Sequence, residues 1–182
     1  MKKPLIAVML FLSTYANAQD LASKFDFRFG VGTSLLSSGD MKTVMFENEL
    51  NYFINNFLST SLSAGYGKSN SGVFETSSFV QGNLNVFISP FKNNNRNDFR
   101  IGTGISYMNV SDTYHESANY DNGIMIDEDY IIDKRNTIGM NIVLENTYTL
   151  HGKVMLGVKL FTQPYKNGDI NSGVLLKLGL KI

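Results

Sequence analysis

The sequence predicts an all-β fold, namely an eight-stranded antiparallel up-and-down transmembrane β-barrel. Within residues 173–182, Val174, Leu176, Leu178, Leu180 and Ile182 fall on one face of a strand, and Lys177, Gly179 and Lys181 fall on the other. Because successive side chains of a strand point to opposite faces, this strand has one fully apolar face. After the N-terminal leader, no run of ~20 consecutive apolar residues could form a membrane-spanning helix. A chain of this kind can cross a membrane only as strands of a closed barrel.

The N-terminus predicts a cleaved secretory signal peptide over residues 1–18. Lys2 and Lys3 precede an apolar core over residues 5–12, and Ala16-Asn17-Ala18 supplies the small residues of a cleavage site. Residues 19–182 are then expected to form a single barrel domain, since they suffice for eight strands of ~9–11 residues with their connections.

Eight segments alternate in hydrophobicity with a period of two, and each is bounded by turn-forming residues. They begin near residues 25, 43, 58, 74, 99, 136, 154 and 174. The first four carry on one face Phe25, Phe27, Phe29, Val31 and Leu35; Val44, Phe46, Leu50 and Tyr52; Leu58, Leu62, Ala64 and Tyr66; and Val80, Leu84, Val86 and Ile88. The last four carry Phe99, Ile101, Ile105 and Tyr107; Ile138, Met140, Ile142, Leu144 and Tyr148; Val154, Leu156, Val158 and Leu160; and Val174, Leu176, Leu178, Leu180 and Ile182.

The connections between these segments differ in length. An even strand count places both chain ends on the same, periplasmic side of the membrane. Asn55-Asn56 and His151-Gly152 are expected to form short turns there, and residues 89–98 a longer, asparagine-rich turn. The connection over residues 110–134 is long and acidic, and it is expected to be an extracellular loop.

The face between the apolar residues distinguishes a membrane barrel from a soluble, lipocalin-like barrel. A soluble barrel turns a charged surface outward, whereas this face is dominated by small residues. The narrow interior of an eight-stranded barrel requires such residues. They are Gly30, Gly32, Ser34, Ser59, Ser61, Ser63, Gly65, Gly102, Gly104, Ser106, Gly139, Gly157 and Gly179.

The same face carries charges of both signs, which we interpret as structural charges of the lumen. Buried charges cost several kcal/mol each unless they are paired, so the two signs should balance. Counting along the first hairpin sets Arg28 opposite Glu49. Counting along the later hairpins sets Lys159 opposite both Glu145 and Lys177. The predicted lumen charges are Asp26, Arg28, Glu47, Glu49, Arg100, Glu145, Lys159 and Lys177, with Glu75 and Lys181 on the same face.

Aromatic side chains are expected at the two membrane interfaces, where amphipathic rings are favoured. The predicted periplasmic set is Phe25, Tyr52, Phe57, Phe99 and Tyr148, and the predicted outer set is Tyr66, Phe74, Tyr107 and Tyr165.

Composition excludes several functional classes. With 16 basic and 16 acidic residues, the chain does not present the basic surface of a nucleic-acid-binding protein. It contains no cysteine, so disulfides, thiolate metal sites and thiol nucleophiles are excluded. The sequence also has no phosphate-binding loop, zinc-ligand spacing or nucleophile elbow.

These features resemble the small outer-membrane β-barrel family of Gram-negative bacteria, the OmpA- and OmpX-like eight-stranded proteins. The resemblance lies in Ala16-Asn17-Ala18, the eight alternating segments and the terminal strand over residues 174–182. It implies an outer-membrane location, with outer-membrane lipids, lipopolysaccharide and the outer-membrane insertion machinery as partners and a monomer as the oligomeric state. Members of the family include structural anchors, adhesins, narrow pores and lipid-modifying enzymes.

Two chemical hypotheses fall within the connection over residues 110–134. His115, Ser117 and a nearby carboxylate could form a hydrolytic triad, but a loop is a poor scaffold for that geometry. Lipid A deacylases of similar fold use a His-x-Ser pair at the outer end of the penultimate strand, where this chain has Phe161-Thr162-Gln163. A cation could be bound by oxygen ligands, although the acidic residues lack the spacing of an EF-hand. They are Asp121, Asp127, Glu128, Asp129 and Asp133.

We therefore expect a non-enzymatic envelope barrel, without a cofactor or a catalytic or metal-binding residue. Its lumen is expected to be plugged by side chains, and its loop over residues 110–134 to contact the surroundings or a partner. Three alternatives remain at this level: a narrow pore for small solutes or ions, a lipid A-modifying enzyme, and a secreted soluble barrel.

Overall fold

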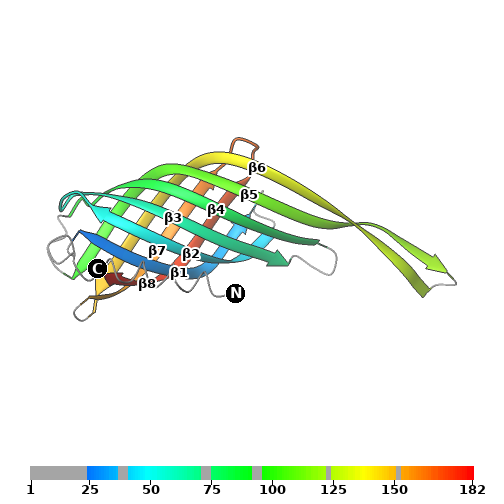
Figure 1. Ribbon diagram of the computed structural model, residues 1–182, viewed down its shortest axis with the longest axis horizontal. Helices are drawn as coiled ribbons and strands as arrows, with labels where there is room; N and C mark the ends of the chain where they lie inside the picture. The colour runs from blue at the N-terminus through cyan, green and yellow to red at the C-terminus, as the bar shows by residue number, and fades with distance from the viewer. Residues whose placement is uncertain (1–23, 37–40, 71–74, 92–95, 122–123, 151–152) are drawn as a thin grey trace, which may run out of the picture.

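The computed structural model describes residues 24–36, 41–70, 75–91, 96–121, 124–150 and 153–182. These residues form eight strands in one closed antiparallel sheet (Figure 1). The predicted signal peptide, Phe74 and the His151-Gly152 turn lie outside the described residues. The strands are β1 (Phe25–Leu36), β2 (Met41–Phe53), β3 (Leu58–Asn70), β4 (Glu75–Ile88), β5 (Asn97–Asp121), β6 (Ile124–Thr149), β7 (Val154–Pro164) and β8 (Ile170–Lys181).

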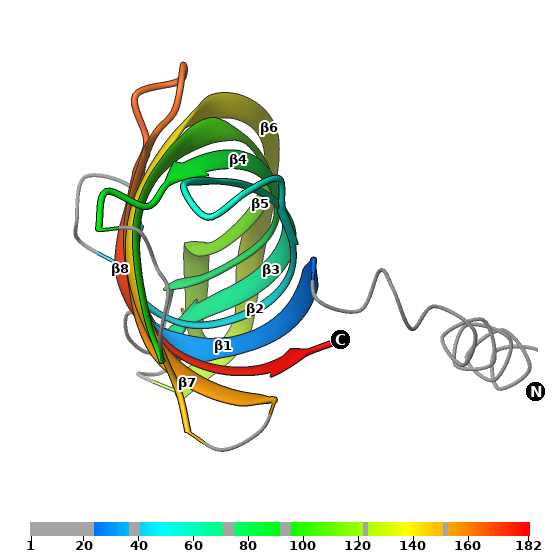
Figure 2. The ribbon, with the colours of Figure 1, turned by 90° about the vertical axis from the view of Figure 1, so that its left-hand side faces the viewer.

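The barrel closes where β1 pairs with β8. The antiparallel register runs from Asp26 opposite Lys181 to Leu35 opposite Ser172, and the N–H of Ile182 donates to the carbonyl oxygen of Phe25 at 3.0 Å. The start of β1 and the end of β8 therefore lie together at one end of the barrel, which faces the viewer in Figure 2. The predicted fold class, an eight-stranded up-and-down barrel, is confirmed.

Side chains alternate between the outside and the inside of the barrel wall. On β8, Leu176 is 62% exposed and the adjacent Leu175 is 0% exposed. Every strand presents large apolar side chains outward in this way, as predicted. Exposed examples, one from each strand in order, are Phe29, Phe46, Leu62, Leu84, Ile105, Met140, Leu156 and Leu178. The described part of the chain contains no helix long and apolar enough to cross a membrane.

The prediction of a loop over residues 110–134 is wrong, because these residues belong mainly to two long strands. β5 continues to Asp121, β6 begins at Ile124, and the two strands pair up to these residues with two register shifts. The resulting hairpin projects beyond the other strands at the end opposite the C-terminus (Figure 1). A two-stranded ladder satisfies the backbone polar groups along its inner side, so a polar sequence can remain extended without a core. The Asn122-Gly123 dipeptide, a frequent hairpin turn, was the sequence signal for this arrangement.

The lumen also contains an apolar layer that the sequence analysis did not predict. Large inward side chains lie beside glycines of the neighbouring strand, so glycine supplies the room that each ring needs in a narrow barrel. A Cβ atom on Gly67, for example, would lie 2.3 Å from the ring of Phe79. The paired positions are Gly67 and Phe79, Gly102 and Phe87, Gly173 and Phe161, and Gly139 and Tyr165.

We expect Gly67→Ala to destabilise the folded barrel by about 1–3 kcal/mol, the usual cost of overpacking. The new methyl group would overlap the ring of Phe79, which is buried in the lumen. Gly82→Ala is the matched control, because the nearest heavy atom to its Cβ would be 4.0 Å away. Urea unfolding in detergent micelles, followed by circular dichroism, measures both free energies. Equal free energies for the two variants would contradict this packing.

Candidate functional site: the charged lumen

The eight predicted lumen charges all lie inside the barrel, on six different strands. None is more than 2% exposed. β1 and β2 contribute two each, and β5, β6, β7 and β8 contribute one each. Since neighbouring residues on each strand face outward, the alternation of the strand brings these residues into the same interior. They are Asp26, Arg28, Glu47, Glu49, Arg100, Glu145, Lys159 and Lys177.

Two lysines and two glutamates form one part of this cluster. Lys159 Nζ donates to Glu47 Oε1 at 2.7 Å and to Glu49 Oε2 at 2.8 Å. Lys177 Nζ donates to the same two oxygens, at 3.2 Å for Glu49 Oε2. Each carboxylate is thus shared by both ammonium groups, which offsets the desolvation of all four side chains.

Two arginines connect the rest of the cluster. Arg100 Nη2 donates to Glu49 Oε1 at 2.7 Å and to Glu145 Oε1 at 3.1 Å. The Arg100 guanidinium also lies 4.0 Å from the centre of the Phe87 ring, in a cation–π contact. Arg28 Nη1 donates to the same oxygen of Glu145, so Glu145 bridges the two arginines. The ion pairs therefore form one continuous network from β1 to β8.

The charge of this network is balanced except at its end. The eight residues comprise four carboxylates and four cations, all at most 2% exposed. Asp98, which the sequence analysis did not select, accepts a hydrogen bond from Arg28 Nη2 at 3.3 Å and has an 18% exposed side chain. The additional negative charge therefore lies at the end of the lumen, where water lowers its cost.

The predicted register is confirmed for two hairpins and wrong for the third. Arg28 lies opposite Glu49 and Glu145 opposite Lys159. Lys177, however, lies opposite Gly157 and not opposite Lys159. The β7–β8 connection includes Gly168 with φ of +91°, a conformation that suits glycine. The pairing of Pro164 with Ile170 centres this hairpin on Asn167, and the two lysines meet through Glu47 and Glu49.

Side-chain amides and hydroxyls fill the lumen beyond the charges. Asn141 donates to Asn85 at 2.8 Å, Gln163 to Asn83 at 3.0 Å and Asn171 to Gln81 at 3.1 Å. Tyr165, predicted to lie at the outer membrane interface, is instead buried in the lumen. Its hydroxyl shares a hydrogen bond with Ser106 Oγ at 2.8 Å. Its bridge partner, Gly139, has no side chain, and this leaves room for the Tyr165 ring inside the barrel.

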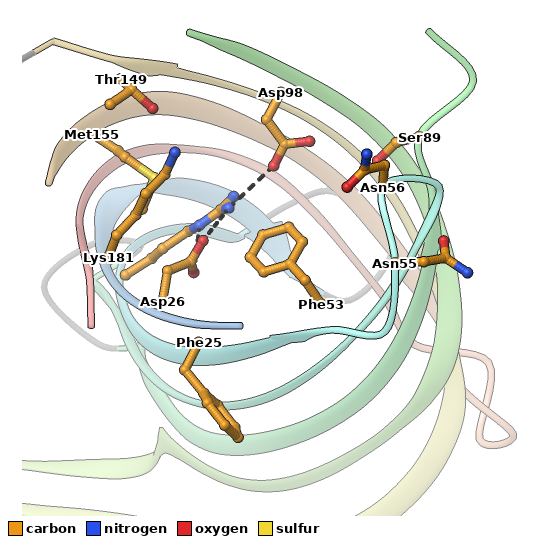
Figure 3. Close-up of a pocket in the computed structure, with 11 residues that line it drawn as sticks. Phe25, Asp26, Phe53, Asn55, Asn56, Ser89, Asp98, Thr149, Met155 and Lys181 are labelled. Atoms are coloured by element: carbon orange, nitrogen blue, oxygen red, sulfur yellow. Dashed lines mark hydrogen bonds and ion pairs between the residues drawn. The ribbon is translucent and has the colours of Figure 1, made fainter. Parts of the chain in front are cut away.

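A cavity of about 180 Å³ opens at the end that carries the start of β1 and the end of β8 (Figure 3). Arg28 and Asp98 line it, together with Asp26, Asn55 and Lys181. A guanidinium has five N–H donors, and those of Arg28 are occupied by Asp26, Asp98, Glu145 and Thr147. This arginine therefore has no donor left for an anionic ligand.

At the opposite end, Arg135 joins the barrel wall to the β7–β8 connection. It donates to Asp112 on β5 and, through Nε, to Asp169 at 3.0 Å. Burial tends to lower the pKa of the Arg135 guanidinium, but its hydrogen bonds and attraction to Asp112 and Asp169 raise the pKa overall. Ser77 on β4 donates to Asp112 at 2.5 Å, so three strands and one connection are held together here.

The residues of the two chemical hypotheses lie on the long hairpin. His115 pairs with Tyr130 and Ser117 with Asp129 across the β5–β6 ladder. Side chains over residues 115–128, including Asp121, Asp127 and Glu128, lie outside what the structure describes. Among the side chains that it does describe, no group of three His, Cys, Asp or Glu residues could hold a metal ion.

The charge network predicts a specific response to Lys159→Met. This substitution keeps an unbranched side chain of similar volume but leaves Glu47 and Glu49 with less positive charge, so we expect a loss of about 3–5 kcal/mol in the free energy of unfolding. Adding Glu47→Gln should restore part of the lost stability, because the cluster then contains three carboxylates and three cations and is balanced again. Lys68→Met, at an exposed position, should change the stability by less than about 0.5 kcal/mol. Urea unfolding measures all three, and a Lys159→Met barrel as stable as the control would refute the account.

Comparison with known proteins gives similarity at the level of the fold. No family model matches the sequence. No curated protein matches it either. Among solved structures, Neisserial surface protein A matches with a TM-score of 0.64 and 13% identity, over 87% of this chain and 97% of that one. The attachment invasion locus protein Ail of Yersinia pestis matches with a TM-score of 0.59 and 10% identity, over the same shares of the two chains.

A third structure, the outer membrane protein OprG of Pseudomonas aeruginosa, matches with a TM-score of 0.57 and 12% identity, over 88% of this chain and 96% of that one. These identities are low, so the similarity concerns the fold and not the activity. The chain has the fold of the small eight-stranded transmembrane β-barrels.

Proposed function

We propose that this protein is a non-enzymatic β-barrel of the outer membrane of a Gram-negative bacterium. The observation that carries the proposal is the apolar outer surface, to which every strand contributes exposed large side chains. Soluble monomers rarely expose contiguous apolar patches larger than a few hundred Å². The acyl chains of a bilayer would cover this surface, and an outer-membrane barrel has this arrangement of apolar and polar faces.

The arrangement of the lumen supports a barrel whose interior is closed to water and solutes. The ion-pair network connects β1 with β2, β5, β6, β7 and β8 across the interior. A second layer follows in which Met45, Phe79, Met108 and Leu175 are buried inside the wall. A continuous water path would have to break ion pairs in a poorly hydrated interior, at a cost of several kcal/mol.

The long hairpin supports a role at the cell surface. On one side, β4 accompanies it only from Ile101 to Tyr114 on β5. On the other side, β7 accompanies it only from Thr149 to Ile142 on β6, followed by the bridge at Gly139. We therefore propose that the part beyond the wall contacts the surroundings or a partner. Residues 1–18 would act as the signal peptide, the insertion machinery would assemble residues 19–182 as a monomer, and outer-membrane lipids and lipopolysaccharide would surround it.

Membrane extraction tests the location. The proposal predicts that the protein remains in the membrane fraction after a high-salt or carbonate wash and dissolves only in detergent, because its apolar surface must stay covered. A peripheral membrane protein in the same preparation, released by the wash, is the control. Release of the folded barrel into buffer without detergent would show that it is a soluble barrel.

The polar lining of the lumen also favours a second candidate, a narrow pore. Planar bilayer recordings distinguish the two. The closed barrel should show no steady conductance after insertion, and a variant that breaks the network, Arg28→Ala with Arg100→Ala, should conduct more often. A steady open state of the unsubstituted protein would replace the closed-barrel proposal with the pore.

A further inference from the structure

Large apolar side chains are exposed in the short connections at the end of the barrel where β1 starts and β8 ends. Ile54 and Phe57 lie between β2 and β3, Phe91 lies just after β4, and Leu150 lies just after β6. All four are exposed, and Phe91 reaches 74%. The three connections are separated along the strand order of the barrel, so these residues are distributed around its rim.

The exposed charged side chains at the same end, within the described residues, are basic. They belong to Lys24 before β1, Arg96 before β5, Lys153 before β7 and Lys181 at the end of β8. The nearby acid, Asp98, is directed into the lumen and bonded to Arg28. We call this set of four apolar and four basic residues the terminal rim.

The composition of the terminal rim matches the surface of an anionic bilayer leaflet. Phe and Leu side chains insert at the boundary between lipid headgroups and acyl chains, and each Lys or Arg close to an anionic leaflet gains about 1 kcal/mol. A compact protein partner would contact a single contiguous patch of the barrel surface. The residues of the terminal rim are instead distributed over several connections around the barrel. A surrounding lipid surface can reach all of them at once.

We propose that the terminal rim binds the headgroups of anionic phospholipids in the adjacent membrane leaflet. This proposal rests on the proposed function as a membrane barrel and adds a lipid preference to it. The apolar side chains insert between the headgroups, and the four basic side chains attract phosphate groups that carry a net negative charge.

The chain contains no tryptophan, so Phe91→Trp introduces a single fluorescent reporter into the terminal rim. The protein is folded into vesicles of phosphatidylcholine and phosphatidylglycerol, in which either one lipid or the other is brominated at the same mole fraction. Brominated phosphatidylglycerol should quench this rim reporter more efficiently than brominated phosphatidylcholine does. The difference should correspond to a binding constant for phosphatidylglycerol that is at least roughly twofold higher than that for phosphatidylcholine. Leu62→Trp, on the outward face of β3 away from the rim, should be quenched equally by the two lipids.

The origin of the preference is tested by charge and by salt. Replacing Lys24, Arg96, Lys153 and Lys181 together by Gln should abolish it, and raised ionic strength should weaken it without any substitution. A preference that survives both changes overturns the role of the basic residues. Equal quenching of the rim reporter by the two lipids overturns the proposal while the membrane barrel stands. Absence of quenching at both reporter positions would instead refute the membrane barrel itself.

Discussion

The alternation of side chains across a closed strand wall is the constraint on which the rest of the structure depends. Each residue that faces outward commits its neighbour to the lumen. Once one face of the sheet is apolar and exposed, charges on the other face are enclosed wherever they lie away from the two ends of the barrel. An enclosed charge is stable only with a partner, and the lumen supplies four carboxylates and four cations at most 2% exposed. The network is therefore the consequence of the outer surface.

The narrow lumen imposes a second condition, which concerns volume. Eight strands enclose an interior that side chains can just fill. Rings such as Phe79 and Phe87 fit because the neighbouring strand presents Gly67 and Gly102 at the same level. Phe87 then provides the surface on which Arg100 lies. The packing of the glycines and the pairing of the charges are thus connected, and both support a closed barrel.

The features that could be predicted are those that depend on neighbours in one strand or one hairpin. The period of two identified the outward face, and hairpin counting placed Arg28 opposite Glu49. The actual ion pairs were beyond that method, because Lys159 on β7 meets Glu47 on β2 across the lumen. Such contacts depend on how the closed sheet curves, which no local pattern contains.

Two other errors have separate physical causes. The connection over residues 110–134 was predicted to be a loop because it is acidic, yet backbone pairing between β5 and β6 needs no apolar face. Tyr165 was assigned to the outer interface because aromatic rings favour it, but Ser106 and Gln163 offer its hydroxyl partners inside the barrel. In both cases hydrogen bonding outweighed the preference inferred from composition.

The adjacent residues Leu175 and Leu176 provide the most direct test of the orientation of the wall. In a detergent-solubilised, methyl-labelled sample, nuclear Overhauser effects between leucine methyl groups and detergent acyl chains report which side chains face the apolar surroundings. The account predicts strong acyl-chain effects at Leu176 and none at Leu175, which is 0% exposed. Acyl-chain effects at Leu175 with none at Leu176 would contradict it.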